Sequence, residues 1–310
     1  MKTAVVLFND RAIIGVPQPL RWLLARYISG KRAPVARDIY RKLGGKSPLL
    51  EQTEDQARAL QKVLGDDFKV VVAMRYWHPF AEQTLREIEA WGAEQVILLP
   101  LYPQFSTTTS GSSLKQWHLV AGGRFKRTRA VCCYPTQPGF IRAMTARIGA
   151  EYGRALAHGR PRLLFSAHGL PQSIIDKGDP YQRQVEQSAA AIVAELAIPD
   201  LDWAICYQSR VGPAKWIGPS TEKELERAGA DKVPVVVTPV AFVSEHSETL
   251  VELDIEYRHL AESLGIPAYF RAPAVGSHPD FIQALAELVR DPMATRGKAC
   301  GCNCLCAEEP

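Results

Sequence analysis

Short runs of apolar residues recur along the chain, and most of them are continuous rather than alternating with polar residues. A short continuous apolar run is typical of a parallel strand that is covered on both faces. Eight such runs predict β-strands: Thr3–Phe8, Phe68–Ala73, Gln95–Pro100, Arg129–Cys133, Arg162–Ala167, Trp203–Gln208, Val233–Thr238 and Pro267–Arg271. The pattern therefore predicts parallel sheets.

Segments with a helical spacing of apolar residues lie between these strands. Ala57, Leu60, Val63 and Leu64, for example, follow helical spacing, and Gly65 can end that helix. The clearest helical patterns are Glu54–Leu64, Phe80–Trp91, Phe140–Ala157, Tyr181–Leu196, Thr221–Ala228 and Thr249–Leu264. Because parallel strands need crossover connections, this alternation predicts an α/β fold.

Eight strands with crossover helices fit either a closed (β/α)₈ barrel or two doubly wound open sheets. Pro135 and Pro138 interrupt the chain between the fourth and fifth strands, which divides the strands into two groups of four. We therefore predict two similar Rossmann-like domains with parallel four-stranded sheets and an active-site cleft between them. The predicted divisions are domains at 1–138 and 139–279, a helix at 280–299 that packs back on the first domain, and a cysteine-rich tail at 300–310.

Composition and charge argue against several classes of function. The 310 residues are 46% hydrophobic with a net charge of +4, and the basic residues are mixed with acidic ones, so nothing indicates nucleic-acid binding. Neither a GxGxxG nor a Walker-type loop is present, which argues against dinucleotide and nucleotide cofactors. No segment has the pattern of a signal peptide or a transmembrane helix, which predicts a cytoplasmic protein.

One apolar segment, Ile13–Ile28, has basic residues in it and beside it. This pattern allows peripheral association with the inner face of a membrane. An ordinary amphipathic segment with basic flanks is the simpler interpretation. The sequence leaves the oligomeric state open.

Residues that can carry chemistry follow the predicted strands, at the ends where ligands gather in both α/β arrangements. His168 ends the fifth strand, and His246 and Glu248 follow the seventh. Two imidazoles and a carboxylate suit a divalent first-row metal ion, and a His–carboxylate pair also suits proton abstraction near neutral pH. A single histidine at a strand end is as often a hydrogen-bonded core residue, so His168 alone does not decide between these interpretations.

Acidic residues recur every four positions after the seventh strand. Glu248, Glu252 and Glu256 would stack on one face of an α-helix. Like charges at this spacing repel by roughly 0.2–0.5 kcal/mol per pair, so the row does not stabilise the helix itself. It is either a solvated acidic face or a path that delivers cations to Glu248.

Aromatic residues at other strand ends predict contact with a large planar ligand. The candidates are Tyr76, Trp77, Tyr102, Phe105, Tyr207 and Trp216, with Arg75, Lys31 or Arg32 as partners for carboxylates of the ligand. Core packing explains some of these aromatic residues. Trp216 lies in a loop between two Gly-Pro pairs and not in a periodic apolar stripe, which favours ligand contact.

Six segments resemble the ferrochelatases, the enzymes that insert ferrous iron into protoporphyrin in the last step of protoheme synthesis. They occur in the family's order and extend over nearly the whole chain: IYRKLGGKSPL (39–49), MRYWHP (74–79), PLYPQFSTTTSGSS (100–113), FSAHGLP (165–171), YQSRVGPAKWIGP (207–219) and VTPVAFVSEHSETLVELDIEY (237–257). The resemblance implies two Rossmann-like domains instead of a barrel. It also implies a lyase with Fe²⁺ and protoporphyrin IX as substrates and no organic cofactor.

The resemblance implies a role for individual residues. His168 would bind the metal and accept pyrrole protons, Glu248 would bind the metal, and His246 would support this pair. Glu252 and Glu256 match the acidic helix that is thought to conduct the metal. The residues predicted to bind the porphyrin are Tyr40, Arg75, Tyr76, Ser112 and Trp216.

The segment after the first strand departs from the family pattern. Asn9 joins directly to Asp10, so the loop and helix that follow the first strand in the family are missing, and with them part of the lip of the porphyrin pocket. This departure motivates an alternative, a catalytically impaired tetrapyrrole- or haem-binding homologue. A chelatase that acts on coproporphyrin or inserts cobalt is the third interpretation.

Four of the seven cysteines lie close together in the tail: Cys300, Cys302, Cys304 and Cys306. Without a secretory signal, a disulfide framework is not expected. Some ferrochelatases hold a [2Fe–2S] cluster with three tail cysteines and one in the body, whose position falls here at Thr107; Cys132 or Cys133 would have to replace it. The tail predicts a [2Fe–2S] cluster, with a zinc site or an unstructured thiol tail as alternatives.

Overall fold

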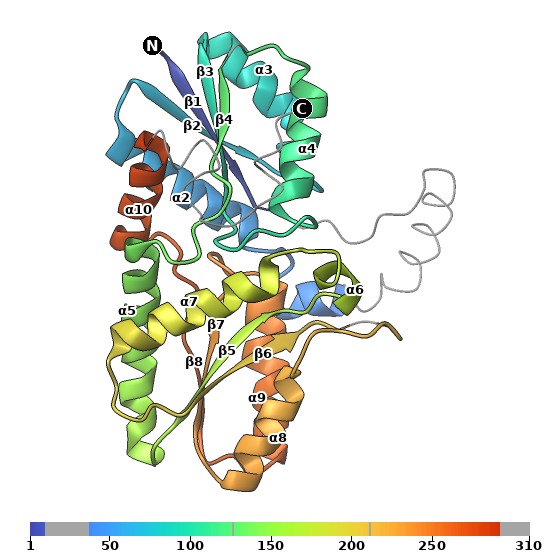
Figure 1. Ribbon diagram of the computed structural model, residues 1–310, viewed down its shortest axis with the longest axis vertical. Helices are drawn as coiled ribbons and strands as arrows, with labels where there is room; N and C mark the ends of the chain where they lie inside the picture. Colours follow the sequence, from blue (N-terminus) through green and yellow to red (C-terminus); the bar gives the residue numbers. More distant parts are fainter. Residues whose placement is uncertain (10–36, 126, 211, 292–310) are drawn as a thin grey trace.

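A computed structural model of the chain describes residues 1–9, 37–125, 127–210 and 212–291. It contains two parallel four-stranded sheets, which lie one above the other in Figure 1. The first sheet has the strand order β2-β1-β3-β4 and the second the order β6-β5-β7-β8, so the second sheet repeats the topology of the first. The prediction of an α/β fold with two open sheets is confirmed.

Several predictions fall outside the described residues and stay predictions. They concern the junction at Asp10, the apolar segment Ile13–Ile28, the cations Lys31 and Arg32, and the cysteine tail at 300–310.

All eight predicted strands are present, and every pairing between them is parallel. Their bounds are β1 (Thr3–Phe8), β2 (Phe68–Ala73), β3 (Gln95–Pro100), β4 (Thr128–Ala130), β5 (Arg162–His168), β6 (Trp203–Gln208), β7 (Val235–Pro239) and β8 (Tyr269–Arg271). The edge strands β4 and β8 are shorter than predicted. Each has a hydrogen-bonded neighbour on one side only, and short edge strands are a usual way to limit unpaired backbone groups.

The helices are α2 (Leu49–Leu64), α3 (Ala81–Trp91), α4 (Ser110–Ala121), α5 (Pro138–Ala155), α6 (Gln172–Ile175), α7 (Tyr181–Leu196), α8 (Thr221–Asp231), α9 (Tyr257–Ser263) and α10 (Pro279–Arg290), with a 3₁₀ turn η1 (Leu156–His158) and a π-helix η2 (Glu248–Glu256). Helices α4 and α6 were not predicted, and one predicted helix is divided. Helix α4 was missed because it begins with small polar residues, although Leu114 and Trp117 bury its inner face. The predicted helix Thr249–Leu264 is divided into η2 and α9.

Both faces of each sheet are buried, which explains the continuous apolar runs. Val5 and Leu7 of β1 belong to a core that extends across both sheets and includes residues of α2, α5, α7 and α10. The alternate residues Ala4, Val6 and Phe8 face a separate core beneath α3 and α4. A third core lies between the second sheet and helices α8 and α9.

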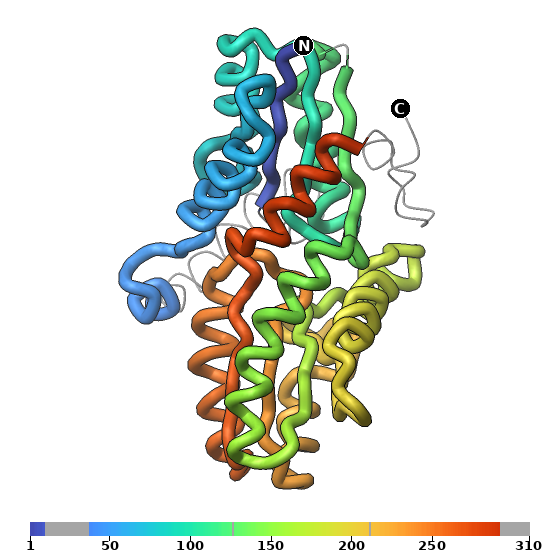
Figure 2. Tube along the Cα trace, turned by 90° about the vertical axis from the view of Figure 1, so that its left-hand side faces the viewer, coloured from blue at the N-terminus to red at the C-terminus, as the bar shows by residue number. Residues whose placement is uncertain are grey.

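Helix α10 runs beside α2 and α5, as both views show (Figures 1 and 2). It returns from the end of the second sheet to the side of the first sheet, where α2 makes the crossover from β1 to β2. The domain boundaries at residues 138 and 279 stay a prediction.

Gly139 marks the closest approach of α5 to α10. A Cβ atom at this position would lie 2.5 Å from Asp280 O and 2.9 Å from Ala284 Cβ. We expect Gly139→Ala to lower the free energy of unfolding by about 1–3 kcal/mol, because overpacking forces the helices apart. Denaturant unfolding measures this change. Gly149→Ala is the matched control, since nothing lies within 4 Å of its added Cβ. Equal stability of the two variants would contradict the prediction.

The carboxyl ends of the two sheets face each other across a buried polar junction. Asn9, which follows β1, donates to Ser244 Oγ at 3.2 Å in the loop after β7. Gln56 of α2 donates to Val243 O at 2.9 Å and to Gly276 O at 3.0 Å. Ligands of parallel α/β sheets bind at the carboxyl ends of the strands. The junction therefore places both candidate binding edges in one region.

Candidate active site

His168 and Glu248 are in direct contact at this junction. His168 ends β5 and Glu248 begins η2, and His168 Nδ1 lies 3.0 Å from Glu248 Oε2. His246 Nε2 lies 3.7 Å from the same oxygen. The side chains of His168 and His246 are each 14% exposed and that of Glu248 is 24% exposed. The structure thus brings together the three residues that were predicted to handle metal and protons.

The three side chains are not arranged as a resident metal centre. Within the described ranges, no group of three or more His, Cys, Asp or Glu side chains could hold a metal ion. A site with two potential ligands already in contact with each other fits a metal ion that passes through better than one that is permanently bound. When His168 Nδ1 carries the proton and donates it to Glu248, the lone pair is on Nε2.

Gly169 allows a close approach next to His168. Its N–H donates to Gln208 O at 2.8 Å, and a Cβ atom would lie only 3.0 Å from that oxygen and 3.3 Å from Trp216 Cε3. Any larger residue would push Trp216 away from the end of β5. The packing places this aromatic ring against Gly169, the residue that follows the candidate catalytic histidine.

Glu252 is held by several hydrogen bonds inside η2. Its carboxylate accepts from Ser209 N at 2.8 Å, Ser209 Oγ at 2.6 Å and Gln208 Nε2 at 2.9 Å, and Tyr257 OH donates to it at 3.1 Å. Burial raises the pKa of Glu252, and the charge of Glu248 adds to this effect, while the hydrogen bonds from Ser209 and Gln208 oppose it. The charged form is therefore disfavoured although the carboxylate is well bonded.

The predicted acidic row has a different geometry from the one expected. Glu248, Glu252 and Glu256 lie on a π-helix, whose i→i+5 hydrogen bonds do not stack residues four apart as an α-helix does. The α-helical stacking was therefore wrong, although Glu248 and Glu252 both face the site. Glu256 is exposed at the far end of η2. Sequence reasoning also missed Gln208, which is the register partner of His168 in the second sheet.

Three residues predicted to bind the porphyrin lie together beside the first sheet, after β2 and on α4. Arg75 Nε donates to Tyr76 OH at 3.0 Å, and Arg75 Nη1 donates to Ser112 O at 2.6 Å. Tyr76, Trp77 and Tyr40 are exposed. An oriented guanidinium beside exposed aromatic rings can meet the edge and face of a flat anionic ligand.

The other aromatic candidates divide between core and site. Tyr102, Phe105 and Tyr207 are buried, so for these residues core packing is the correct interpretation. Trp216 is half-buried, and its indole N–H is buried without an acceptor in the part of the chain that the structure describes. An unpaired buried donor costs about 1–3 kcal/mol, which favours a role for Trp216 in ligand contact.

The described cysteines give limited support for a cluster. Thr107 occupies the expected body position and donates to Asp179 Oδ2 through both N, at 2.8 Å, and Oγ1, at 2.7 Å. Cys132 and Cys133 are both buried, and Cys133 Sγ accepts from Gln184 Nε2 at 3.3 Å. Cys300, Cys302, Cys304 and Cys306 lie outside the described residues.

A cavity of about 550 Å³ lies elsewhere, lined by Met1, Glu94 and Arg127 among others. These residues precede β1, β3 and β4, which places the cavity at the amino ends of the first sheet. Because ligands of such sheets bind at the carboxyl ends, the cavity is not part of the candidate site.

Comparisons with known proteins identify the family of this chain. The family model for ferrochelatase matches residues 4–293. A ferrochelatase of Caulobacter vibrioides is 52% identical over 307 residues, covering 96% of this chain and 88% of the relative. A ferrochelatase of Wolbachia sp. subsp. Drosophila simulans is 52% identical over 288 residues, covering 91% of this chain and 90% of the relative.

Two solved structures share the fold at low sequence identity. SirB from Bacillus subtilis with Fe³⁺ has a TM-score of 0.59 at 13% identity and covers 96% of this chain and 98% of its own. CbiX, described as the terminal enzyme for biosynthesis of siroheme in denitrifying bacteria, has a TM-score of 0.53 at 15% identity and covers 94% of this chain and 98% of its own. On the strength of the family model and the ferrochelatase relatives, the chain belongs to the ferrochelatase family.

Proposed function

We propose that this chain is a lyase that inserts Fe²⁺ into protoporphyrin IX to give protoheme, the last step of haem synthesis. The observation that carries the proposal is the contact of 3.0 Å between His168 Nδ1 and Glu248 Oε2 at the carboxyl ends of the second sheet. In a chain of this family, that contact supports His168 as the proton acceptor and Glu248 as a metal ligand.

The reaction exchanges two pyrrole protons for one divalent metal ion. His168 accepts the two pyrrole protons one after the other and passes each to solvent, and the adjacent Glu248 carboxylate stabilises the imidazolium that forms each time. Glu248 also supplies an oxygen ligand to Fe²⁺ before the metal enters the ring. His246, 3.7 Å from the same carboxylate oxygen, supports the orientation of Glu248.

The porphyrin is bound between this pair and the first domain. Arg75 pairs with a propionate, because its guanidinium has five N–H donors and the bonds to Tyr76 and Ser112 orient it while other donors remain. Tyr40, Tyr76 and Trp216 contact the macrocycle.

Fe²⁺ approaches Glu248 along η2. Glu256 is exposed at the far end of η2, whereas Glu252 and Glu248 are half-buried, so the row of carboxylates runs from the surface to the site. Successive carboxylates provide the hard oxygen ligands that a divalent cation exchanges as it moves.

The remaining predictions concern binding partners other than the substrates. A [2Fe–2S] cluster bound by the four tail thiols stays a prediction. The absorption spectrum and the iron content of the freshly isolated protein test it. Peripheral membrane association rests on Ile13–Ile28. None of the described helices is both long and apolar enough to cross a bilayer.

The direct test is the reaction itself. Purified protein is given Fe²⁺ and protoporphyrin IX without oxygen, and protoheme is followed by its absorption. We expect catalytic formation of protoheme. Tight porphyrin binding without turnover would instead support the catalytically impaired homologue. Parallel assays with coproporphyrin and with Co²⁺ identify the third interpretation, which predicts a higher kcat/KM for one of those substrates.

A further inference from the structure

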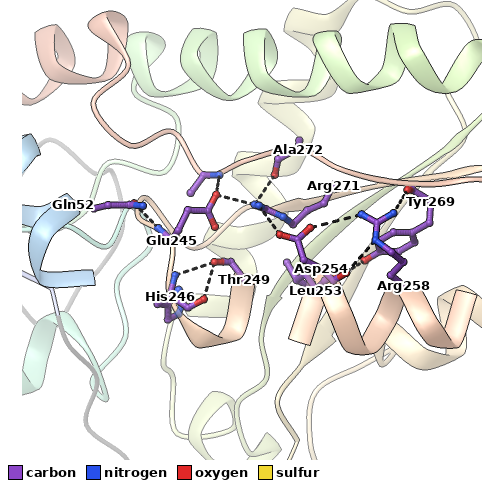
Figure 3. Close-up of polar contacts among 11 residues, drawn as sticks. Gln52, Glu245, His246, Thr249, Leu253, Asp254, Arg258, Tyr269, Arg271 and Ala272 are labelled. Carbon is purple, nitrogen blue, oxygen red and sulfur yellow. Dashed lines mark hydrogen bonds and ion pairs between the residues drawn. The ribbon is translucent and has the colours of Figure 1, made fainter. Parts of the chain in front are cut away.

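Arg271 bridges two carboxylates that flank the candidate site in the sequence. It ends β8, its side chain is 10% exposed, and it contacts Glu245 Oε1 and Asp254 Oδ2 at 2.8 Å each (Figure 3). Glu245 directly precedes His246, and Asp254 lies on η2 beyond Glu248. One guanidinium therefore holds both ends of the segment that carries His246 and Glu248.

The Glu245 end of this bridge is fastened to both domains. Glu245 Oε1 also accepts from Ala274 N at 2.8 Å, and Glu245 N donates to Gln52 Oε1 of α2 at 2.7 Å. The next residue, His246, donates through its N–H to Thr249 Oγ1 at 2.9 Å. Figure 3 shows these contacts in a row from α2 to β8. The backbone around His246 is thus fixed from the first domain and from β8.

The Asp254 end is fastened where the π-helix continues into α9. Tyr269 OH donates to Leu253 O at 2.8 Å, and Arg258 Nη1 donates to Tyr269 O at 2.8 Å. A π-helix is rare and needs support from its surroundings. Residues of β8 provide that support by binding η2 through a backbone carbonyl and through Asp254.

The bridge is poorly explained as a source of stability. Arg271 Nε and Glu245 Oε2 are buried without hydrogen-bond partners in the described residues. A buried ion pair must offset the desolvation of both charges, and an incompletely bonded one does so badly. A role in holding a defined geometry accounts better for this arrangement.

We propose that Arg271 is a positioning residue that sets the place of Glu248 relative to His168 by tying Glu245 and Asp254 to β8. His168 is on β5, whereas His246 and Glu248 are on the segment that Arg271 holds. Loss of the bridge takes the guanidinium away from Glu245 and leaves Asp254 with the more distant Arg258, at 3.8 Å, and the segment relaxes away from His168. This proposal rests on the proposed function, because it assigns Arg271 to the metal side of that reaction.

The chain offers a matched control in Arg162. This residue begins β5, is 7% exposed in its side chain, and contacts Asp202 Oδ2 and Asp231 Oδ2 at 2.8 Å each. It is thus another buried arginine between two carboxylates in the same sheet, at the opposite end from His168. Arg162→Met and Arg271→Met should lower the melting temperature alike, while only Arg271→Met should alter metal handling.

The experiment compares steady-state kinetics of the full chain, with Zn²⁺ affinity in the absence of porphyrin as a second measurement. In Arg271→Met we expect the KM for Fe²⁺ to rise and the Zn²⁺ affinity to fall by about 10- to 100-fold, the usual effect of losing a residue that orients a metal ligand. The KM for protoporphyrin should not change. Arg271→Lys should recover part of the loss, because an ammonium group can replace only one arm of the bridge.

Equal metal KM and Zn²⁺ affinity in Arg271→Met and Arg162→Met would overturn the proposal. If Arg271→Met does not fold, Asp254→Ala cuts the bridge at a more exposed residue, and an unchanged metal KM there is equally decisive against it. Wild-type protein that binds Zn²⁺ but forms no haem would refute the proposed function and not the role of Arg271. In that case the Zn²⁺ affinities of Arg271→Met and Arg162→Met still test the role of Arg271.

Discussion

Replacing His168 with alanine is expected to reduce kcat for protoheme formation by about 100- to 10,000-fold, the range that a general base contributes. The variant loses the imidazole that lies 3.0 Å from Glu248 and that we propose as the acceptor of pyrrole protons. Anaerobic kinetics with Fe²⁺ and protoporphyrin measure this loss. Porphyrin binding should be retained, because the hydrogen bonds that orient Arg75 come from Tyr76 and Ser112 and do not involve His168.

His118→Ala is the control for this variant. His118 is an exposed histidine on α4, and its loss should leave kcat unchanged. Porphyrin binding can be followed by quenching of the macrocycle's fluorescence in all three proteins. A His168→Ala protein that turned over as fast as His118→Ala would show that the proposed proton acceptor is wrong.

Replacing Glu248 with glutamine is expected to raise the KM for Fe²⁺ and lower kcat together. Glutamine has nearly the same shape but no charge, so the hard anionic ligand and the partner of the imidazolium are both lost. The loss in kcat/KM should exceed about 100-fold, the upper end for residues that only support a metal ligand. Initial rates at varied Fe²⁺ with saturating porphyrin measure it.

Glu226→Gln is the control for Glu248→Gln, because it removes one negative charge elsewhere on the chain. Glu226 is exposed on α8, so its neutralisation changes the net charge equally without touching the site. If Glu248→Gln kept the Fe²⁺ KM of Glu226→Gln, Glu248 would not be a metal ligand. Normal metal KM with reduced kcat would restrict Glu248 to proton transfer.

Much of the fold could be predicted because its signals are local. The bounds of β1, β2, β3 and β6 agree with the prediction, since each is a continuous apolar run. The π-helix η2 could not be predicted. Glutamates four residues apart occur in the sequence whether the segment forms an α-helix or a π-helix. What distinguishes η2 is its long-range bonds, such as Gln208 to Glu248 O at 3.0 Å and Tyr269 to Leu253 O at 2.8 Å.

The candidate site was predictable in part for a similar reason. His168 and Glu248 stand out because strand ends collect ligands and because the surrounding segments resemble a family. Arg271 carries no such signal: its partners Glu245 and Asp254 come from other elements, and only the folded chain brings them to β8. Trp216 was identified from its loop context, whereas Tyr102 and Tyr207 occupy similar positions and are buried in the core.

The core that continues across both sheets limits hinge motion between the two sheets and the separate folding of the two halves. Val5 and Leu7 of the first sheet and Leu163 and Phe165 of the second belong to one apolar cluster. Swinging the two halves apart would expose that cluster to water, so a hinge-like opening is costly. Substrate entry and product release are then left to loops and helix segments at the junction. Neither half can keep this cluster buried without the other, so we expect the chain to unfold as one unit.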